Sequence, residues 1–155
     1  MFAAMIEVRK IELPVDGIDG LQAEAKAEGY DFIETLVDDW TSASNRFDAA
    51  GEMLLGCFEG ETLIAVGGLN VDPFTRDPLI GRIRRVYVRR DWRNKGIGAA
   101  MMTWLIEQAS ESFSCVRLRA GSPDAARLYE RLGFVAIENP DATHMLSFNA
   151  VAADA

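Results

Sequence analysis

The chain has 155 residues, of which 49% are hydrophobic and 26% charged, and its 24 acidic side chains outnumber the 16 basic ones, for a formal net charge of -8. This composition is that of a globular domain that buries a core without disulfides or metal, and its acidity argues against a general nucleic-acid-binding protein. The charge is uneven, because residues 1–80 hold 5 basic and 16 acidic side chains, whereas residues 81–95 hold 7 basic and 1 acidic.

Few residues of this sequence suit disulfides, metal sites or membrane spans. Cys57 and Cys115 lie singly in apolar runs without C-x-x-C spacing, which predicts free thiols in a reducing compartment. One histidine and two scattered cysteines predict no metal site. No apolar stretch approaches the roughly 18 residues of a membrane span, and the run Met1 to Ile6 is too short for a signal peptide. We therefore expect a cytoplasmic, metal-independent domain.

The first half of the chain predicts a strand, two helices and a hairpin. Residues Ile6 to Leu13 alternate apolar and polar side chains and stop at Pro14, as a strand would. The stretch from Ile18 to Trp40 has helical spacing, with Gly29 as the predicted C-terminal cap of its first helix. Two apolar runs within residues 52–71 flank the turn Glu59-Gly60-Glu61, which predicts a β-hairpin.

The second half alternates strands and helices. The predicted elements are a strand from about Leu79 to Arg89, a helix from about Gly96 to Ser110, a strand at Cys115 to Ala120, a helix from about Pro123 to Leu132, and strands at Phe134–Ile137 and His144–Phe148. The long helix should bury the side that carries Ile97, Met101, Trp104, Leu105 and Gln108. The order β-α-α-β-β-β-α-β-α-β-β predicts a mixed α+β fold, as a single domain over 1–155 with its core at about 5–149.

A glycine-containing turn joins a predicted strand to the long helix, and it reads Arg93-Asn94-Lys95-Gly96-Ile97-Gly98-Ala99. The first turn of a helix carries N–H groups without intrahelical acceptors, and the helix dipole adds positive charge there. Glycines let a phosphate approach these amides, and Arg93 and Lys95 add formal charge. The alternative is an ordinary turn on a basic surface. A P-loop string is missing, and Met101 replaces the third glycine of a dinucleotide fingerprint.

Two motifs carry a resemblance to a known family. The first runs Val86-Tyr87-Val88-Arg89-Arg90-Asp91-Trp92-Arg93-Asn94-Lys95-Gly96-Ile97-Gly98-Ala99-Ala100-Met101, and the second runs Ala125-Ala126-Arg127-Leu128-Tyr129-Glu130-Arg131-Leu132-Gly133-Phe134. In this order, with a strand between them, they resemble the acyl-CoA-binding motif and the A-x-x-L-Y-x-x-x-G-F helix of the GNAT-type N-acetyltransferase superfamily. The resemblance covers nearly the whole chain and is weakest over residues 14–50. It implies the GNAT acyl-CoA N-acyltransferase fold, a mostly antiparallel sheet of about 6–7 strands with helices on both faces.

The resemblance also implies an activity, the direct attack of an acceptor amine on the cosubstrate acetyl-CoA. Tyr129 matches the family's general acid, which protonates the departing thiolate. The backbone of Val86 and Val88 would pair with the pantetheine arm, and the Val88 N–H would polarise the thioester carbonyl. The coenzyme-binding residues implied in this way are Val86, Tyr87, Val88, Arg93, Asn94, Lys95, Gly96, Ile97, Gly98, Ala99 and Ser122.

The second motif has its own helix signals. Ser122 is a good N-cap, Pro123 fits the first helical position, and Gly133 fits the C-terminal cap. Leu128 would pack inward, while Tyr129 presents its hydroxyl to a cleft or, alternatively, is a core residue. Ser122 departs from the family, since many members carry Asn at that position.

The sequence assigns neither the residue that acts as general base nor the chemical class of the acceptor. Many members carry a glutamate near the start of the fourth strand, where this chain has Arg82, so Glu52, Asp72 and water are the candidates, and His144 is expected in a late strand instead. Four arginines on predicted strands suit an acceptor carboxylate or phosphate, or only a solvated face: Arg82, Arg84, Arg117 and Arg119. The acidic first half suits a cationic amine instead, and the loop Asn45-Arg46-Phe47-Asp48 is placed where the family shapes its acceptor site.

Three classes of function are compared. The first is an acetyl-CoA-dependent N-acetyltransferase, which moves an acetyl group to a primary amine of a small molecule or peptide. The second is a non-catalytic acyl-CoA-binding sensor on the same fold, which the retained Tyr129 disfavours. The third, a nucleic-acid-binding module, is disfavoured by the net charge of -8. We expect no membrane partner; a homodimer is compatible with the fold, although no sequence feature indicates one.

Overall fold

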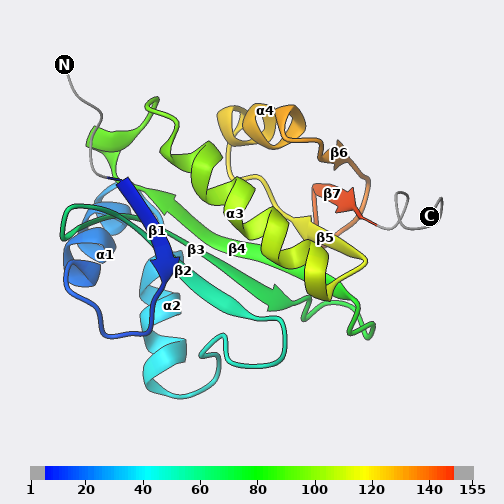
Figure 1. The fold of residues 1–155 in the computed structure, drawn as a ribbon, viewed down its shortest axis with the longest axis horizontal. Helices are drawn as coiled ribbons and strands as arrows, with labels where there is room; N and C mark the ends of the chain where they lie inside the picture. Colours follow the sequence, from blue (N-terminus) through cyan, green and yellow to red (C-terminus); the bar gives the residue numbers. More distant parts are fainter. Residues whose placement is uncertain (1–5, 149–155) are drawn as a thin grey trace.

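The computed structural model describes residues 6–148, which form one seven-stranded sheet and the helices that cover it (Figure 1). In chain order the elements are β1 (Ile6–Lys10), α1 (Ile18–Ala27), α2 (Phe32–Thr41), β2 (Met53–Glu59), β3 (Thr62–Val71), β4 (Ile80–Val88), the short 3-10 helix η1 (Arg90–Trp92), α3 (Ile97–Ser112), β5 (Cys115–Leu118), α4 (Pro123–Arg131), β6 (Val135–Ala136) and β7 (His144–Ser147). This order and the mixed α+β class confirm the fold expected from the sequence.

The strands are ordered β1-β2-β3-β4-β5-β7-β6 across the sheet. All neighbours are antiparallel except β4 and β5, which run parallel. This parallel pairing is short, because only Ile80, Gly81 and Arg82 of β4 have partners in β5. We call the point after Arg82, where the two strands separate, the β4–β5 fork.

The helices cover the two faces of the sheet. On one face, α1 and α2 bury Leu21, Ile33 and Leu36 against Phe58 and Val66 of the sheet. On the other face, α3 crosses in front of the strands and α4 lies beside it (Figure 1). The core beneath α3 combines apolar residues of the helix and of the sheet, among them Met102, Leu105, Leu69 and Val116. Both faces are therefore closed by apolar packing, which stabilises the sheet around the fork.

Most predicted boundaries agree with the structure to within a few residues. The first strand is shorter than expected, because it ends at Lys10 rather than Leu13. The hairpin turn contains Gly60, whose φ of 60° is in the left-handed region that glycine tolerates. Of the two thiols, Cys57 is buried and Cys115 is half-buried, and both are free. No helix within residues 6–148 has the length and apolar character needed to cross a membrane.

One face prediction was wrong. Trp104 was expected on the buried side of the long helix, but it is 41% exposed. Ile97, Met101 and Leu105 of the expected side are buried, together with Met102 and Ala109. On a helix with 3.6 residues per turn this side is rotated away from Trp104, so the indole lies at its solvent-facing margin.

Candidate active site

Beyond the fork, no strand within residues 6–148 pairs with the edge of β4 that faces β5. Arg89 donates its backbone N–H to the Ile64 carbonyl of β3 at 2.9 Å. Since the N–H groups of a strand point alternately to its two sides, those of Val88 and Val86 point the other way, toward the opening. Beyond Arg82, β5 does not take up these amides. The fork thus offers backbone donors and acceptors to an extended ligand, as an added strand would use them.

The first turn of α3 lies next to this edge. The turn begins at Gly96, whose φ is 82° and where an added Cβ would have no atom within 4 Å, so its surroundings are open. Gly98 lies between strand and helix, because a Cβ there would be 3.8 Å from Val88 and 3.6 Å from Leu128 of α4. Asn94 also has a left-handed φ, 61°, which turns the chain into the helix. The free N–H groups of this turn are therefore accessible to an anion.

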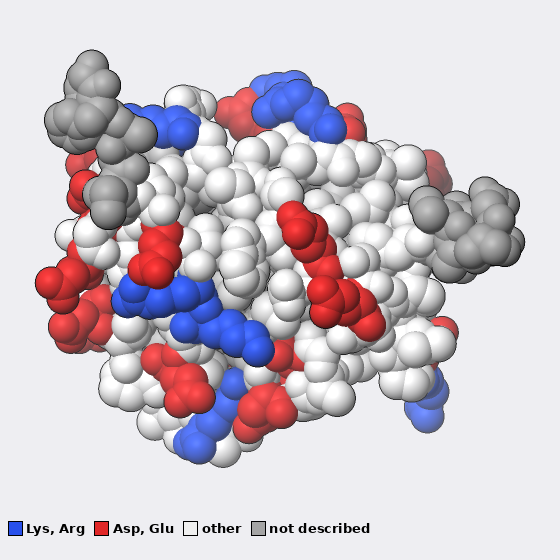
Figure 2. Space-filling view, viewed as in Figure 1, with Lys and Arg blue, Asp and Glu red and all other residues white. Residues whose placement is uncertain are grey.

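Basic side chains lie on both sides of this surface. Figure 2 shows Lys and Arg atoms over α4 and at the turn before α3, with a largely uncharged surface between them. The residues that are exposed there are Lys95, Arg127 and Arg131. Lys95 lies over the ring of Trp92, with its Nζ 5.2 Å from the ring centroid. The margin at the turn before α3 therefore carries the positive charge of Lys95, whereas the α4 margin has mixed charge, because Arg127 pairs with Asp124 and Glu130 is also exposed there.

Arg93 has a different environment from the one expected of a phosphate ligand. Its guanidinium donates to both carboxylate oxygens of Glu28 in α1, at 3.0 and 2.6 Å, and its Nε donates to the Val88 carbonyl at 3.0 Å. The hydrogen bonds from Arg93 are the first cause that holds the pKa of Glu28 below its ordinary value. The side-chain charge of Arg93 is thus already paired, and it fixes the turn to both α1 and β4.

Tyr87 points to the same helix. Its buried hydroxyl contacts carboxylate oxygens of Glu24 and Glu28 at 2.7 and 2.6 Å. Burial, followed by these hydrogen bonds, raises the pKa of Tyr87. The side chain of Tyr87 therefore anchors β4 to α1, and only its backbone is left for a role at the fork. These acids of α1 lie about 60 residues from Tyr87 in the chain, so no local pattern of the sequence links them to it.

Tyr129 is buried, yet its hydroxyl has no partner. The side chain is 8% exposed and packs on Phe134 with ring centroids 6.0 Å apart. Burial raises the pKa of Tyr129. Within residues 6–148 the only buried side-chain nitrogen or oxygen without a hydrogen bond is Arg117 Nη2, so the unpaired Tyr129 hydroxyl still reaches solvent. This is the environment of a protonated phenol that can donate its proton to a ligand.

Ser122 has the helix-capping role that its position predicts. Its Oγ accepts a hydrogen bond from the Ala125 N–H at 3.1 Å, and Pro123 follows at the start of α4. The hydroxyl proton of Ser122 remains available for a second partner, since this bond uses only an oxygen lone pair. In the rest of the helix, Tyr129 is buried while Leu128 and Leu132 are partly buried, so the tyrosine ring packs deeper than expected.

Two of the four strand arginines contact a single carboxylate at the fork. Asp72 Oδ2 lies 2.9 Å from Arg117 Nε and 3.4 Å from Arg82 Nη1. The Asp72 side chain is 0% exposed, so this carboxylate is enclosed by its two cations. Arg82 and Arg117 are therefore structural at the fork, and Asp72 is a poor candidate for a general base. Arg119 is exposed and donates to the Pro140 carbonyl at 2.6 Å.

His144 occupies the late strand expected for it. It begins β7 and is buried, with Nε2 2.8 Å from Glu130 Oε2 and Nδ1 2.8 Å from Thr143 Oγ1. Both ring nitrogens are therefore engaged. This leaves Glu52 as the carboxylate, of the two proposed from the sequence, that lies at an open cavity.

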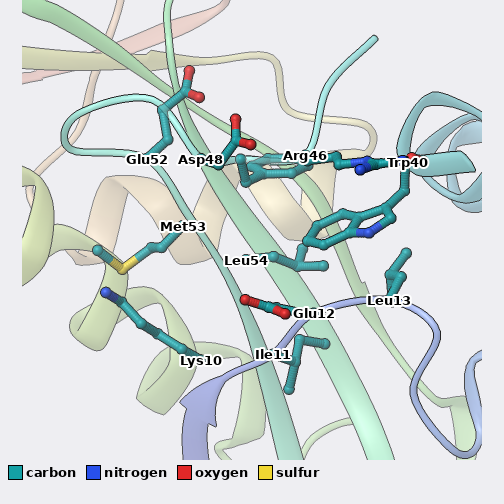
Figure 3. Close-up of a pocket in the computed structure, with 11 residues that line it drawn as sticks. Lys10, Ile11, Glu12, Leu13, Trp40, Arg46, Asp48, Glu52, Met53 and Leu54 are labelled. Atoms are coloured by element: carbon teal, nitrogen blue, oxygen red, sulfur yellow. The ribbon is translucent and has the colours of Figure 1, made fainter. Parts of the chain in front are cut away.

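Two adjoining cavities lie on the α2 side of the molecule. The first, of about 820 Å³, lies between the end of β1 and the loop that follows α2 (Figure 3). The second, of about 460 Å³, lies between that loop, β3 and Arg84 of β4. They share Arg46, Asp48 and Glu52 as walls. In Figure 3 the carboxylates of Asp48 and Glu52 lie at the end of the first cavity that is remote from Leu13. The expected acceptor loop does line both cavities.

A known family and several solved structures are similar to this chain over most of its length. Residues 18–134 match the model of the Acetyltransferase (GNAT) family. Among solved structures, a provisionally named acetyltransferase from Exiguobacterium sp. 255-15 is 25% identical with a TM-score of 0.83, over 96% of this chain and 97% of that one. The GCN5-related N-acetyltransferase from Kribbella flavida is 16% identical with a TM-score of 0.70, over 91% of this chain and 95% of that one.

A third structure, the GNAT-family acetyltransferase from Streptococcus pneumoniae, is 18% identical with a TM-score of 0.64, over 90% of this chain and 96% of that one. The comparison with curated proteins finds no match. The two structures below 25% identity show the shared fold, and the family model covers 117 of the 155 residues, from 18 to 134. The chain belongs to the GNAT family of acetyltransferases.

Proposed function

We propose that this protein is an N-acetyltransferase that moves an acetyl group from acetyl-CoA to a primary amine of a small molecule or peptide by direct attack. The observation that carries the proposal is the β4–β5 fork, which combines an unpaired strand edge, an open helix N-terminus at Gly96 and the unpartnered hydroxyl of Tyr129. These are the three kinds of group that a thioester with a diphosphate tail requires.

The residues present fit the cosubstrate. The amides at and after Gly96 bind the pyrophosphate, with Lys95 adding positive charge at the rim. The backbone of Val86 and Val88 pairs with the amides of the pantetheine arm. Arg93 supports this arrangement indirectly. Its Nε donates a hydrogen bond to the Val88 carbonyl, while the Val88 N–H is left to bind the thioester oxygen. The side chains of Tyr87 and Ile97, which are buried, contribute to the scaffold beneath the site.

Bound acetyl-CoA supplies the thioester, whose C–S bond breaks as the C–N bond to the amine forms. The Val88 N–H stabilises the negative charge that develops on the carbonyl oxygen. Tyr129 donates its phenolic proton to the departing sulfur, and recovers a proton from the acetylated nitrogen or from water. Burial of the Tyr129 ring keeps the phenol protonated at neutral pH, since it raises the pKa of the group.

Only an uncharged amine can attack the thioester, so an acceptor that arrives as an ammonium ion must first lose a proton. Glu52 is the candidate for this step. Its carboxylate lines the cavity beside Arg84 and is fixed by the N–H groups of Ala49 and Val71, at 3.1 and 2.9 Å. We propose that Glu52 accepts the proton directly or through water. The alternative is transfer to bulk water alone.

The proposal is tested by thiol release from acetyl-CoA across a panel of primary amines, with mass spectrometry of the acetylated product. We expect turnover with at least one amine, and loss of that turnover in Tyr129→Phe. A protein that binds acetyl-CoA but acetylates no member of a broad panel would be an acyl-CoA-binding sensor instead. A protein that does not bind acetyl-CoA at all would contradict both functions.

A further inference from the structure

One basic side chain at the fork has no role in the proposed reaction. Arg84 is half-buried in β4. Its neighbours Arg82, Arg85 and Arg117 each contact a carboxylate. By contrast, no ion pair or side-chain hydrogen bond formed within residues 6–148 includes Arg84. A guanidinium that has lost part of its hydration without gaining an anion is a favourable binding site for one.

A bulge in β4 directly after Arg84 turns the next side chain, Arg85, to the same face. The register against β3 shifts between Val66 and Gly68, and Arg85 has a left-handed φ of 60°. Arg85 reaches Asp39 of α2, and Arg84 lines a cavity together with the same Asp39. Two consecutive side chains therefore turn to the α2 face, where a regular strand would alternate them.

The cavity that Arg84 lines adjoins the fork. Its volume of about 460 Å³ is in the range of small-molecule sites. Asn70 of β3 is also part of its wall, and the partner of Asn70 in β4 is Arg82, the last residue that pairs with β5. The loop after α2 forms the opposite wall of the cavity. This loop is held on β3 because Phe47 packs directly on Gly68, where an added Cβ would lie 2.5 Å from the ring.

The charges around the cavity select the ligand. Asp39, Asp48 and Glu52 lie in its wall together with Arg84 and Arg46, so carboxylates outnumber guanidinium groups there. Unlike Arg117 Nη2, no nitrogen of Arg84 is both buried and unpaired, so its guanidinium is open to the cavity. A dianionic phosphate would be repelled by the three carboxylates, whereas a single carboxylate is balanced by one guanidinium, and an ammonium group on the same molecule is attracted by the acids.

We propose that Arg84 binds the carboxylate of the acceptor, and that the acceptor is a small amino acid whose amine is presented to the thioester at the fork. The inference rests on the proposed acetyl transfer and specifies its substrate class. Arg84 lies four residues before Val88, whose N–H is assigned to the thioester oxygen, or about 13 Å along a regular strand. The bulge at Arg85 shortens this span, so an amino acid with several bonds between its two charged groups fits between them. A polyamine, which has no anionic group, would leave Arg84 without a partner.

Matched sets of acceptors test this inference. Thiol release from acetyl-CoA is measured with a series of amino acids, each compared with its carboxamide, its decarboxylated amine and an aminoalkyl phosphate of similar length. We expect the best amino acid to exceed each of its analogues by about 10-fold or more in kcat/KM, as a charge-assisted hydrogen bond provides. Arg84→Gln should reduce this preference to about 2-fold, and Arg84→Lys should retain part of it.

The control is Arg76→Gln, which removes an exposed arginine from the loop after β3 and should leave the preference unchanged. Calorimetric titration with acetyl-CoA accompanies every variant, and we expect the same affinity for the wild type and Arg84→Gln. The inference is overturned if the wild type binds acetyl-CoA but accepts the amide, the amine or the phosphate as well as the acid, or accepts no amino acid. It is also overturned if Arg84→Gln keeps the preference. Absence of acetyl-CoA binding by the wild type would contradict the proposed function itself.

Discussion

Arg93 and Glu28 form a two-point ion pair that joins the turn before α3 to the C-terminal end of α1, with N–O distances of 3.0 and 2.6 Å. The pair connects segments that are 65 residues apart in the chain. Because the same arginine also donates to the Val88 carbonyl, one side chain fixes the relative positions of the helix N-terminus and the strand edge. The proposed coenzyme site depends on those positions.

Replacing Glu28 by Gln should therefore weaken the site without contacting the ligand. We expect acetyl-CoA to bind several-fold more weakly and the free energy of unfolding to fall by about 1 kcal/mol, as for a partly exposed bidentate pair. Titration calorimetry and urea unfolding measure the two effects. Glu34→Gln is the matched control, because Glu34 pairs with Lys26 on the exposed surface of the helices and should change neither quantity measurably. Equal effects of the two substitutions would contradict the role of Glu28.

The contribution of Glu28 to stability should depend on pH. The hydrogen bonds from Arg93 and Tyr87 lower the pKa of Glu28 in the folded state. A lowered pKa means that the unfolded chain binds the proton more readily, so the contribution is complete above the unfolded value of about 4.3 and is lost as the pH falls through the folded value. The difference in unfolding free energy between wild type and Glu28→Gln should therefore shrink from pH 7 to pH 3.5. A difference that stays constant over this range would disprove the coupling.

Tyr129→Phe removes the proposed proton donor and keeps the packed ring. We expect kcat to fall by about 100-fold or more, with acetyl-CoA affinity unchanged, because a general acid contributes roughly 100- to 10,000-fold. Steady-state thiol release and calorimetry report the two quantities. Tyr30→Phe is the control, since Tyr30 is 40% exposed and should show wild-type turnover. Near-normal kcat in Tyr129→Phe would exclude the general-acid role.

Gly96→Glu adds a side chain and a negative charge at the proposed phosphate site. Gly60→Glu provides a close match, because both glycines have left-handed φ values, 82° and 60°, and a Cβ at either would meet no atom within 4 Å. The backbone strain of about 1 kcal/mol should be similar in the two variants. We expect acetyl-CoA binding to be lost in Gly96→Glu and retained in Gly60→Glu. Tight binding by Gly96→Glu would place the phosphates elsewhere.

Asp72→Asn tests the ion cluster behind the fork. The substitution leaves the buried side chains of Arg82 and Arg117 without their shared carboxylate, and uncompensated buried charge typically costs about 3–5 kcal/mol. We expect a loss of that size in the unfolding free energy measured in urea. Asp38→Asn, at an exposed position of α2, should change it by less than about 0.5 kcal/mol. A small effect of Asp72→Asn would mean that the cluster is not a structural unit.

The sequence was sufficient for the order of elements and for the starts of the two helices that follow Gly96 and Ser122, because both depend on local features. Gly96 and Ser122 begin helices for reasons that involve only their near neighbours: a left-handed φ at one, and a hydrogen bond to Ala125 at the other. Periodicity was less reliable for Trp104, since the tilt of α3 on the sheet decides which margin of its apolar side is buried.

Partners distant in the sequence could not be predicted. The charge of Arg93 was expected at the phosphates, but its guanidinium pairs with Glu28, which is 65 residues away in the chain. Likewise, Arg82, Arg84 and Arg117 share a residue type and a strand context, and the position of Asp72 separates the two structural arginines from the open one. The alternation of apolar and polar side chains along β4 does not predict its bulge.

The central claim is that the β4–β5 fork holds the thioester of acetyl-CoA beside Tyr129, and a crystal structure of the complex tests it most directly. We expect the pantetheine arm along Val86 and Val88, the pyrophosphate at the amides that follow Gly96, and the sulfur within hydrogen-bonding distance of the Tyr129 hydroxyl. A coenzyme bound at another surface, or a sulfur remote from Tyr129, would contradict the account.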